Sequence, residues 1–313
     1  MKNSRQYLLL FLRGIAMGAV DLVPGISAGT IAFVTGIYAE LINSIKSFNL
    51  QAIRILKADG IPATWQHING SFLTILLAGI LVSQFSLAGI MRFLLDTYGL
   101  PLWSFFTGLI MASVIYLLRQ HPPRRYVDTG GFCLGLICAY GISIAPAVML
   151  GGDYITMFFA GSIALCAMIL PGISGAFVLV LLGLYPVYID ALVNVHMDLL
   201  VVFATGGVVG LMLFSRLLSW LLDHYKNTVI AIMCGFLVAS LNVIWPWKLV
   251  TESILSHSGG TIVLASENVL PHNYQAAVGQ DPQIFVCTMA LLAGFCLVLG
   301  LETIGNRYRE KLK

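Results

Sequence analysis

The sequence predicts an all-α polytopic membrane protein, built as an inverted repeat in which each half is a broken helical hairpin followed by three transmembrane helices. Three observations predict this class. Of the 313 residues, 58% are hydrophobic and only 10% are charged, and the mean hydropathy is +0.91, as is typical of integral membrane proteins. Several apolar stretches are long enough to cross a bilayer. One short motif, "PGIS", occurs twice, at 24–27 and at 171–174.

The two PGIS motifs lie inside two predicted hairpins, over residues 7–45 and 154–192. Proline breaks helical hydrogen bonding and glycine permits a sharp turn, so each hairpin is either two helices or a re-entrant loop. Both alternatives return the chain to the side from which it entered. Arg13 interrupts the first apolar run and no cleavage site of small residues is present, so we expect the N-terminus to be retained.

Uninterrupted apolar stretches predict the remaining spans, because each is long enough for a hydrocarbon core of about 30 Å. They cover residues 72–95, 100–118, 130–150, 199–221, 229–246 and 284–304. Each hairpin is thus followed by three crossings. We predict one membrane domain with a first repeat over 1–150 and a second over 151–313.

The charges of the connections predict the orientation, because cytoplasmic loops of membrane proteins carry an excess of Lys and Arg. The connection at 119–128 carries three basic residues and the tail at 306–313 carries four, whereas the links at 96–101 and 151–154 carry none. Both termini are therefore predicted to be cytoplasmic. The first hairpin then enters from the cytoplasm and the second from outside.

The two hairpins can be aligned with an offset of 147 residues. This offset pairs Gly14 with Gly161, Pro24 with Pro171, Gly25 with Gly172, Ser27 with Ser174, Gly36 with Gly183, and Tyr38 with Tyr185. Short apolar segments also agree by chance, but the orientation deduced from charge independently makes the two copies inverted. Inverted repeats are typical of secondary transporters, whose discontinuous helices form a substrate site near the middle of the membrane.

The residues around the two turns are candidates for binding an anion. A helix begins after each motif, and the N–H groups of its first turn lack helical partners and attract anions. Ser27 and Ser174 either cap their own helices or donate a hydrogen bond to a phosphate oxygen. The candidate substrate-binding residues are Arg13, Pro24, Gly25, Ser27, Gly29, Thr30, Pro171, Gly172, Ser174 and Gly175.

Charged residues inside apolar segments sharpen this prediction, because burial of charge in a membrane is costly. Arg13 is the candidate for direct contact with a phosphate; its alternative role is to reach the cytoplasmic headgroups. Asp21 and Glu40, on the two arms of the first hairpin, are candidates for binding a coupling ion. Arg92 and Asp96 are four residues apart and either pair along one helix face or line the outer mouth.

The sequence predicts no catalytic residue, metal site or cofactor. Its six cysteines have no Cys-x-x-Cys spacing and lie in apolar runs, so we expect them to pack in the core: Cys133, Cys138, Cys166, Cys234, Cys287 and Cys296. A net charge of +3, without a basic face, does not indicate nucleic-acid binding. The outer segment 248–283 is a lid, a partner surface or a simple polar connection.

The segment "AMGAVDLVPGISAGTIAFVTGIYAELI", at 16–42, resembles the signature of the polyprenyl-phosphate (undecaprenyl phosphate) transporter family, and 170–185 resembles its second copy. The resemblance extends in order and spacing over nearly the whole chain. It implies a protein of the bacterial cytoplasmic (inner) membrane that returns undecaprenyl phosphate, the carrier lipid for cell-wall sugars, from the outer to the inner leaflet. One departure is Ala28, where we expect the family to have glycine.

The lipid's negative charge would move inward against an inside-negative potential, so we expect a compensating proton or sodium ion, bound at Asp21 or Glu40. Two other functions stay open. Undecaprenyl-diphosphate phosphatases share the re-entrant plan but carry Pro-Gly-x-Ser-Arg-Ser, where this chain has Gly175 and Ala176. A transporter of a small soluble anion would use the same helix ends. We expect a transporter and not an enzyme; whether it forms a homo-oligomer stays open.

Overall fold

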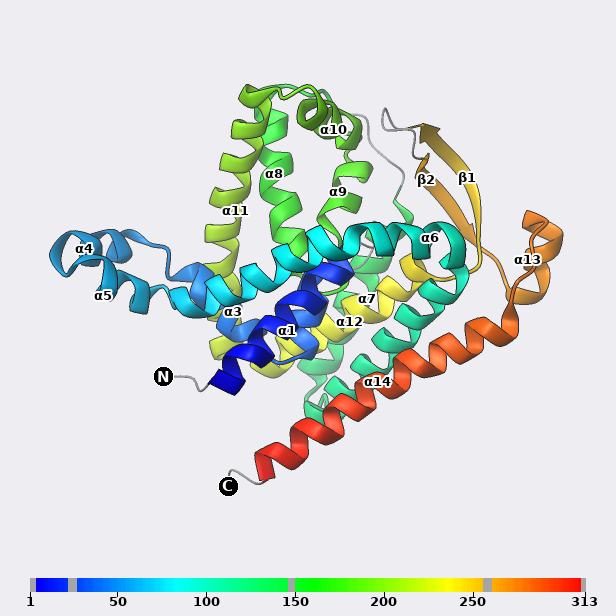
Figure 1. Cartoon of the computed structure of the whole chain (residues 1–313), viewed down its shortest axis with the longest axis horizontal. Helices are drawn as coiled ribbons and strands as arrows, with labels where there is room; N and C mark the ends of the chain where they lie inside the picture. The colour runs from blue at the N-terminus through cyan, green and yellow to red at the C-terminus, as the bar shows by residue number, and fades with distance from the viewer. Residues whose placement is uncertain (1–3, 22–26, 146–149, 256–260, 311–313) are drawn as a thin grey trace. The chain divides into compact units, whose positions relative to one another are not determined.

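A computed structural model describes residues 4–21, 27–145, 150–255 and 261–310, and helices dominate it (Figure 1). In chain order the elements are α1 (Ser4–Asp21), α2 (Ala28–Val34), α3 (Tyr38–Lys46), α4 (Leu50–Ala58), α5 (Gly60–His67), α6 (Gly70–Gln120), α7 (Tyr126–Ile144), α8 (Tyr154–Ile169), α9 (Gly175–Leu181), α10 (Tyr185–Val193), α11 (Met197–His224), α12 (Lys226–Ile244), β1 (Lys248–Leu255), β2 (Thr261–Asn268), α13 (Pro271–Val278) and α14 (Ile284–Glu310). The helices confirm the predicted polytopic membrane class.

Within the described residues, five helical segments are long and apolar enough to cross a membrane. They are Gly70–Leu87, Phe93–Gln120, Tyr126–Ile144, Met197–His224 and Lys226–Ile244. Two bent helix pairs, α2 with α3 and α9 with α10, raise the number to as many as seven. Each of the five segments overlaps a predicted span, with ends that differ by two to eight residues, and the shorter apolar helix Ile284–Gly300 lies within the predicted last span.

Helix α6 contains two of the predicted spans. Tyr98 interrupts it with φ −126° and ψ 37°, outside the helical region, three residues before Pro101. Proline removes one helical hydrogen bond and crowds the preceding turn, so a break at this place has a local cause. The chain therefore crosses as two helices joined by a kink.

The chain divides into two compact units. The first unit contains residues 1–91 and 146–229, and the second contains 92–145 and 230–313. Each unit thus combines segments from both halves of the sequence, and both broken hairpins belong to the first unit. The division into repeats at 1–150 and 151–313 concerns duplication of the chain, and it stays a prediction.

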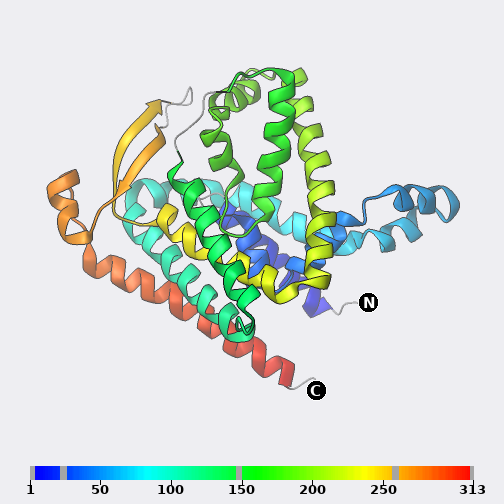
Figure 2. The same cartoon turned by 180° about the vertical axis from the view of Figure 1, so that it is seen from behind.

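In the first unit, α8 and α11 lie side by side (Figures 1 and 2) and approach closely through glycines. A Cβ atom on Gly161 would lie 2.1 Å from the carbonyl oxygen of Phe203, and one on Gly206 would lie 2.0 Å from that of Phe158. Small residues at these positions let the two helix backbones touch, which is how helices associate in membranes without a strong hydrophobic driving force.

Helices α1 and α6 make the same kind of contact. A Cβ atom on Gly14 would lie 2.4 Å from the carbonyl oxygen of Leu76, and one on Gly79 would lie 2.4 Å from that of Phe11. Phe11 and Gly14 precede Phe158 and Gly161 by the same 147 residues that relate the two turns. The duplicated pattern therefore includes the way in which the first arm of each hairpin packs.

Each hairpin contains a second break that the Pro-Gly signal did not predict. The pair α2 and α3 is bent by 118°, and the pair α9 and α10 by 116°. Gly36 and Gly183, with φ of 76° and 68°, stand at the two bends. Positive φ is readily adopted only by glycine, so these two residues permit the chain to turn there.

The second unit is held together by two further glycine-mediated helix pairs. A Cβ atom on Gly108 of α6 would lie 2.0 Å from the carbonyl oxygen of Leu291 of α14, and one on Gly135 of α7 would lie 2.2 Å from that of Ile232 of α12. Each pair therefore packs backbone against backbone, as expected for membrane helices.

The outer segment 248–283 departs from the predicted all-α class, because β1 and β2 form an antiparallel two-stranded sheet, from Lys248 opposite Asn268 to Leu255 opposite Thr261. A partly buried aromatic side chain supports its base. The indole N–H of Trp245 donates to the carbonyl oxygen of Val269 at 2.9 Å. The segment is therefore a structured hairpin followed by α13; its role as a lid or a partner surface stays untested.

The predicted packing of the cysteines in the core is correct for only some of them. Cys234 and Cys287 are buried and Cys166 is partly buried, whereas Cys133, Cys138 and Cys296 are exposed. The three exposed thiols lie on α7 and α14. An apolar run in a membrane helix therefore does not distinguish a core position from a lipid-facing one.

Candidate functional site

The first turn ends at Ser27, which caps α2. Its backbone is extended, with φ −107° and ψ 139°, and its hydroxyl oxygen accepts a hydrogen bond from the N–H of Gly29 at 3.1 Å. The same hydroxyl donates to the carbonyl oxygen of Met168, at the end of α8. Ser27 is almost fully buried. Its hydroxyl thus serves as a helix cap and as a link between the two hairpins.

The second turn ends at Ser174, which stands at the corresponding position before α9. Its backbone is similar, with φ −94° and ψ 130°, but its side chain makes no capping hydrogen bond. The hydroxyl of Ser174 has no hydrogen-bond partner in the part of the chain that the structure describes, and the residue is half-buried. Of the two serines, Ser174 is therefore the one whose hydroxyl is available to a ligand.

The two turns are in direct contact. The backbone N–H of Gly172 donates to the hydroxyl oxygen of Thr30 at 3.0 Å, and Thr30 is fully buried. Gly29 touches the end of α8, where a Cβ atom would lie 2.2 Å from the carbonyl oxygen of Ile169. Pro171 is also fully buried. The predicted site residues 27–30 and 171–174 therefore meet, and backbone fills most of the space between them.

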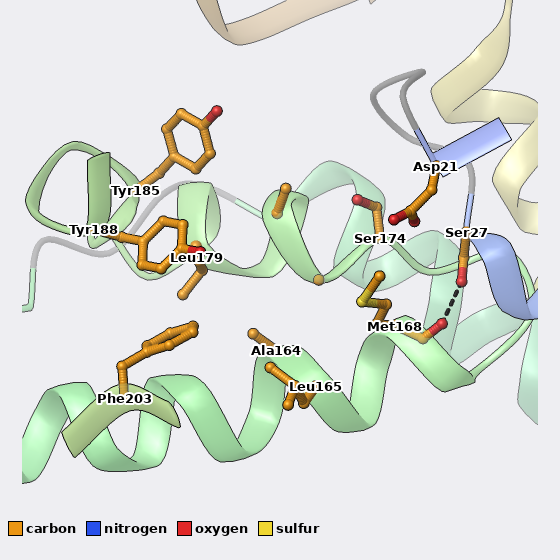
Figure 3. A pocket seen from close by; sticks show the side chains of 12 residues that line it. Asp21, Ser27, Ala164, Leu165, Met168, Ser174, Leu179, Tyr185, Tyr188 and Phe203 are labelled. Atoms are coloured by element: carbon orange, nitrogen blue, oxygen red, sulfur yellow. Dashed lines mark hydrogen bonds between the residues drawn. The ribbon is translucent and has the colours of Figure 1, made fainter. Parts of the chain in front are cut away.

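A cavity of about 190 Å³ opens beside this contact (Figure 3). Its polar end is formed by Asp21, Ser27 and Ser174, with the neighbouring backbone of Gly175. Its other end is formed by apolar and aromatic side chains: Ala164, Leu165, Leu179, Tyr185, Tyr188 and Phe203. The cavity is therefore amphipathic, with hydroxyl and carboxyl groups at one end and mainly aliphatic and aromatic side chains, two of them tyrosines, at the other.

The apolar end of the cavity rests on the core of the hairpin. Leu179 and Phe203 belong to one buried cluster, and the rings of Tyr188 and Phe203 are 4.7 Å apart between centroids. These aromatic residues were not predicted as site residues. The alignment of Tyr185 with Tyr38 was the sequence signal that pointed to this position, whereas nothing in the sequence distinguished Phe203 from other apolar residues of α11.

The structure does not bring all predicted residues to the cavity. Arg13 is half-buried on α1 and is not among the lining residues. Glu40 lies on α3, where its carboxylate accepts a hydrogen bond from the side-chain N–H of Asn69 at 3.1 Å, also away from the lining. Pro24 and Gly25 lie outside the described residues. Asp21 is thus the coupling-ion candidate that reaches the cavity.

No group of three or more His, Cys, Asp and Glu side chains that could hold a metal ion occurs within the described ranges. The oxygen atoms at the polar end of the cavity come from one carboxyl group and two hydroxyl groups. The cavity therefore offers hydrogen-bonding groups and hydrocarbon as its means of binding.

These features define a multi-pass membrane protein with a candidate ligand site between its broken helices. Its helices are long enough to span a membrane, and an amphipathic cavity lies beside the contact between the two bent helix pairs. Comparisons with known proteins place it more closely. A family model described as undecaprenyl phosphate translocase-like matches residues 17–262. The chain therefore belongs to the undecaprenyl phosphate translocase-like family.

Curated relatives agree with this family. The chain is 41% identical over 309 residues to a polyprenyl-phosphate transporter of Vibrio cholerae, with 99% of both chains covered. It is 32% identical over 254 residues to a polyprenyl-phosphate transporter of Staphylococcus aureus, with 75% of this chain and 85% of the relative covered. No solved structure matches the chain significantly.

Proposed function

We propose that this protein moves a polyprenyl phosphate, such as undecaprenyl phosphate, from the outer to the inner leaflet of the bacterial cytoplasmic membrane, so that the carrier lipid is recycled for envelope synthesis. The observation that carries the proposal is the match over almost the full length of both chains to a relative named as a polyprenyl-phosphate transporter. Both termini are proposed to be cytoplasmic, as the charged connections predict.

The chemistry of the cavity supports a lipid phosphate as the ligand. The hydroxyl of Ser174 and the backbone around Gly175 would meet the phosphate, and Leu179 and Phe203 would meet the first isoprene units. A volume of about 190 Å³ lies below the ~300–1,000 Å³ of pockets that enclose drug-sized ligands, so a long polyprenyl tail would not fit inside the cavity. The tail would remain among the membrane lipids while the headgroup enters the protein.

The remaining predicted residues receive different roles in this proposal. Ser27, Gly29 and Thr30, with Pro171 and Gly172, hold the two turns against each other and so position the cavity. This role follows from the hydrogen bonds from Ser27 to Met168 and from Gly172 to Thr30. Direct phosphate contact by Arg13, Pro24 and Gly25 stays a prediction.

We further propose alternating access, with the two hairpins as inverted copies of one structural unit. The support is local: the bounds of α2 and α9 differ by 147 residues at both ends, and those of α3 and α10 do the same. Inverted repeats in transporters let one half adopt the conformation of the other, which exposes a central site to each side in turn.

An energetic argument supports coupling to a cation. Inward movement of negative charge against an inside-negative potential costs about 2.3 kcal/mol per charge per 100 mV. Accumulation of a lipid phosphate with up to two negative charges on the inner side therefore requires a source of free energy. A proton or sodium ion that moves with the lipid would neutralise part of this charge.

Translocation can be measured with the purified protein in liposomes that contain polyprenyl phosphate in both leaflets. A membrane-impermeant phosphatase is added outside, and the released phosphate is followed over time. We expect that liposomes without protein stop at the outer-leaflet share, whereas liposomes with protein continue until nearly all lipid has reacted. Release that stops at the same level in both samples would contradict the proposal.

A matched pair of variants connects this activity to the cavity. Ala176 lines the cavity and is exposed, so Ala176→Trp fills the cavity without disturbing the buried core. Ala39 is an exposed residue of α3 outside the lining, and Ala39→Trp is the control. We expect translocation to fall at least about tenfold in the first variant, which corresponds to about 1.4 kcal/mol, and to persist in the second.

The same preparation separates the other two functions. A phosphatase of the diphosphate lipid would release inorganic phosphate from polyprenyl diphosphate without any added enzyme. A carrier of a small anion would take up labelled inorganic phosphate into liposomes that lack the lipid. We expect neither reaction, and we expect a large excess of inorganic phosphate to leave lipid translocation unchanged.

A further inference from the structure

The charge of the cavity is opposite to the charge that an anion site requires. Of the twelve residues that line it, Asp21 alone carries an ionisable acidic or basic side chain other than tyrosine, and its carboxyl group lies at the polar end with Ser174 (Figure 3). The Asp21 carboxyl group also interacts with the backbone N–H of Ala28. A phosphate at this end would therefore lie near a carboxylate, and the two negative charges would repel each other.

The elements around the cavity supply no obvious counter-charge. Helices α2, α8 and α9, and residues 70–91 of α6, contain no Asp, Glu, Lys, Arg or His. On α1 itself, Arg13 precedes Asp21 by eight residues, about 12 Å along the helix axis. A cation at that distance is separated from the carboxyl group by two helical turns.

The two other helices that line the cavity contribute further acidic groups at positions away from it. Asp190 of α10 accepts a hydrogen bond from Asn194 at 2.7 Å, and Asp198 of α11 accepts one from the hydroxyl of Tyr154 at 2.7 Å. The basic residue of α11 within its apolar length, Arg216, lies thirteen residues beyond the lining residue Phe203. None of these three charged residues lines the cavity.

Resting on the proposed function, we propose that Asp21 is the coupling residue: it carries a proton whenever the cavity holds the lipid phosphate, and its neutral carboxyl group donates a hydrogen bond to a phosphate oxygen. The hydroxyl of Ser174 donates a second hydrogen bond. One proton is taken up with each lipid at the outer side and is released with it at the inner side. The proton removes the repulsion and cancels one of the charges that would otherwise move against the potential.

The same geometry favours a proton over a sodium ion. Hard metal cations are held by several oxygen ligands at once. At the polar end of the cavity, the hydroxyl of Ser27 already accepts from Gly29 and donates to Met168, which leaves the carboxyl group of Asp21 and the hydroxyl of Ser174. Two side chains are too few to replace the hydration shell of a metal ion, whereas a proton needs only the carboxyl group.

Binding measured as a function of pH tests this assignment. The second ionisation of a phosphate monoester occurs near pH 6, so between about pH 7.5 and 9 the lipid itself is a dianion throughout. In the pH range in which Asp21 is deprotonated in the free protein and protonated in the complex, binding of the lipid takes up one proton. Linkage then requires the affinity for the lipid to fall up to about tenfold for each unit by which the pH rises. We expect this fall for the wild-type protein, and a flat profile above pH 7.5 for Asp21→Asn, which imitates the neutral carboxyl group.

Two further variants make the result specific. Glu40→Gln, which alters the other coupling candidate outside the cavity, should keep the pH dependence of the wild-type protein. Asp21→Glu keeps an ionisable group, so its lipid affinity should still depend on pH, with a displaced midpoint. This variant also provides a test if Asp21→Asn does not fold. Profiles of Asp21→Asn, or of Asp21→Glu, that superimpose on the wild-type profile from pH 5 to 9 would overturn the inference.

A transport measurement separates this inference from the proposed function. In liposomes in which the side to which the lipid is delivered is alkaline, we expect the wild-type protein to move the lipid several-fold faster than without a pH gradient. This acceleration should occur with or without sodium. Asp21→Asn should lose the response to the gradient. A wild-type protein that translocates the lipid but ignores the gradient, or responds only to sodium, overturns proton coupling alone. A wild-type protein that neither binds nor moves polyprenyl phosphate at any pH overturns the proposed function.

Discussion

The two broken hairpins have nearly the same backbone and different chemistry. Their short helices begin and end 147 residues apart, their bends differ by only 2°, between 118° and 116°, and both turn at a glycine with positive φ. Yet the serine that opens each short helix is used differently. Ser27 is bonded to Gly29 and Met168, whereas Ser174 faces the cavity without a cap bond.

A second difference lies at the end of each first arm. With the same offset, Asp21 of the first hairpin corresponds to Met168 of the second, so a carboxyl group stands where its counterpart has a thioether. Both residues line the cavity. The two hairpins thus share the bounds of their short helices and differ at these two pairs of positions in the groups that they present to the cavity.

The contact between the two turns offers the most severe test of this asymmetry. Gly29 corresponds to Ala176, but a Cβ atom on Gly29 would lie 2.2 Å from the carbonyl oxygen of Ile169, whereas Ala176 is exposed. We expect Gly29→Ala to reduce the free energy of unfolding by about 1–3 kcal/mol, because the added methyl group forces the backbones apart. The measurement is reversible unfolding of the protein in lipid or detergent.

The matched change in the second hairpin is Ala176→Gly, which removes a methyl group from an exposed position in the first turn of α9. It should cost no more than about 1 kcal/mol, the usual penalty for glycine in a helix. Equal losses for the two substitutions would show that the hairpins do not meet in the asymmetric way described.

The two serines give the next largest expected difference. Ser27→Ala removes a helix cap and the hydrogen bond to the carbonyl group of Met168, so we expect a loss of about 2 kcal/mol in stability. Ser174→Ala removes no capping bond and should change stability by less than about 0.5 kcal/mol while it weakens lipid binding. Thermal unfolding and lipid binding measured on both variants would distinguish them; a reversed order would invalidate the roles assigned here.

Much of the fold could be predicted from local sequence signals. Long apolar stretches predicted the spans, because a helix must satisfy its backbone hydrogen bonds internally to cross lipid. The second Pro-Gly motif, at 171–172, marked the break between α8 and α9, whereas the first, at 24–25, lies outside the described residues. The charge-based orientation led to the prediction of an inverted repeat, and the bounds of the short helices recur with the predicted offset of 147 residues.

Other features were not predictable because their causes are not local. The bond from Ser27 to Met168 joins residues 141 positions apart, so nothing near Ser27 indicates that its hydroxyl is occupied. The helices α4 and α5 lie between the first predicted hairpin and the first predicted span, in a segment for which the sequence predicted no helix. The sheet of β1 and β2 lies in a segment whose polar composition suggested a plain connection, since pairing of two strands depends on register between distant residues.

At the bends at Gly36 and Gly183, in contrast to the serines, we expect substitutions in the two hairpins to have equal effects. Both residues have positive φ, and an added Cβ atom on Gly36 would meet no other atom within 4 Å. Any cost of Gly36→Ala must therefore come from the backbone, and we expect about 1 kcal/mol for holding alanine in the left-handed region.

Gly183→Ala should cost the same amount, and the double variant should lose the sum, because the two bends belong to different hairpins. Gly89→Ala, at an open position of α6 with ordinary helical geometry, is the control and should stabilise the protein by about 0.5–1 kcal/mol. A loss of stability for Gly36→Ala or Gly183→Ala alone would mean that only one of the two bends requires a residue with positive φ. The backbones of the two hairpins would then differ.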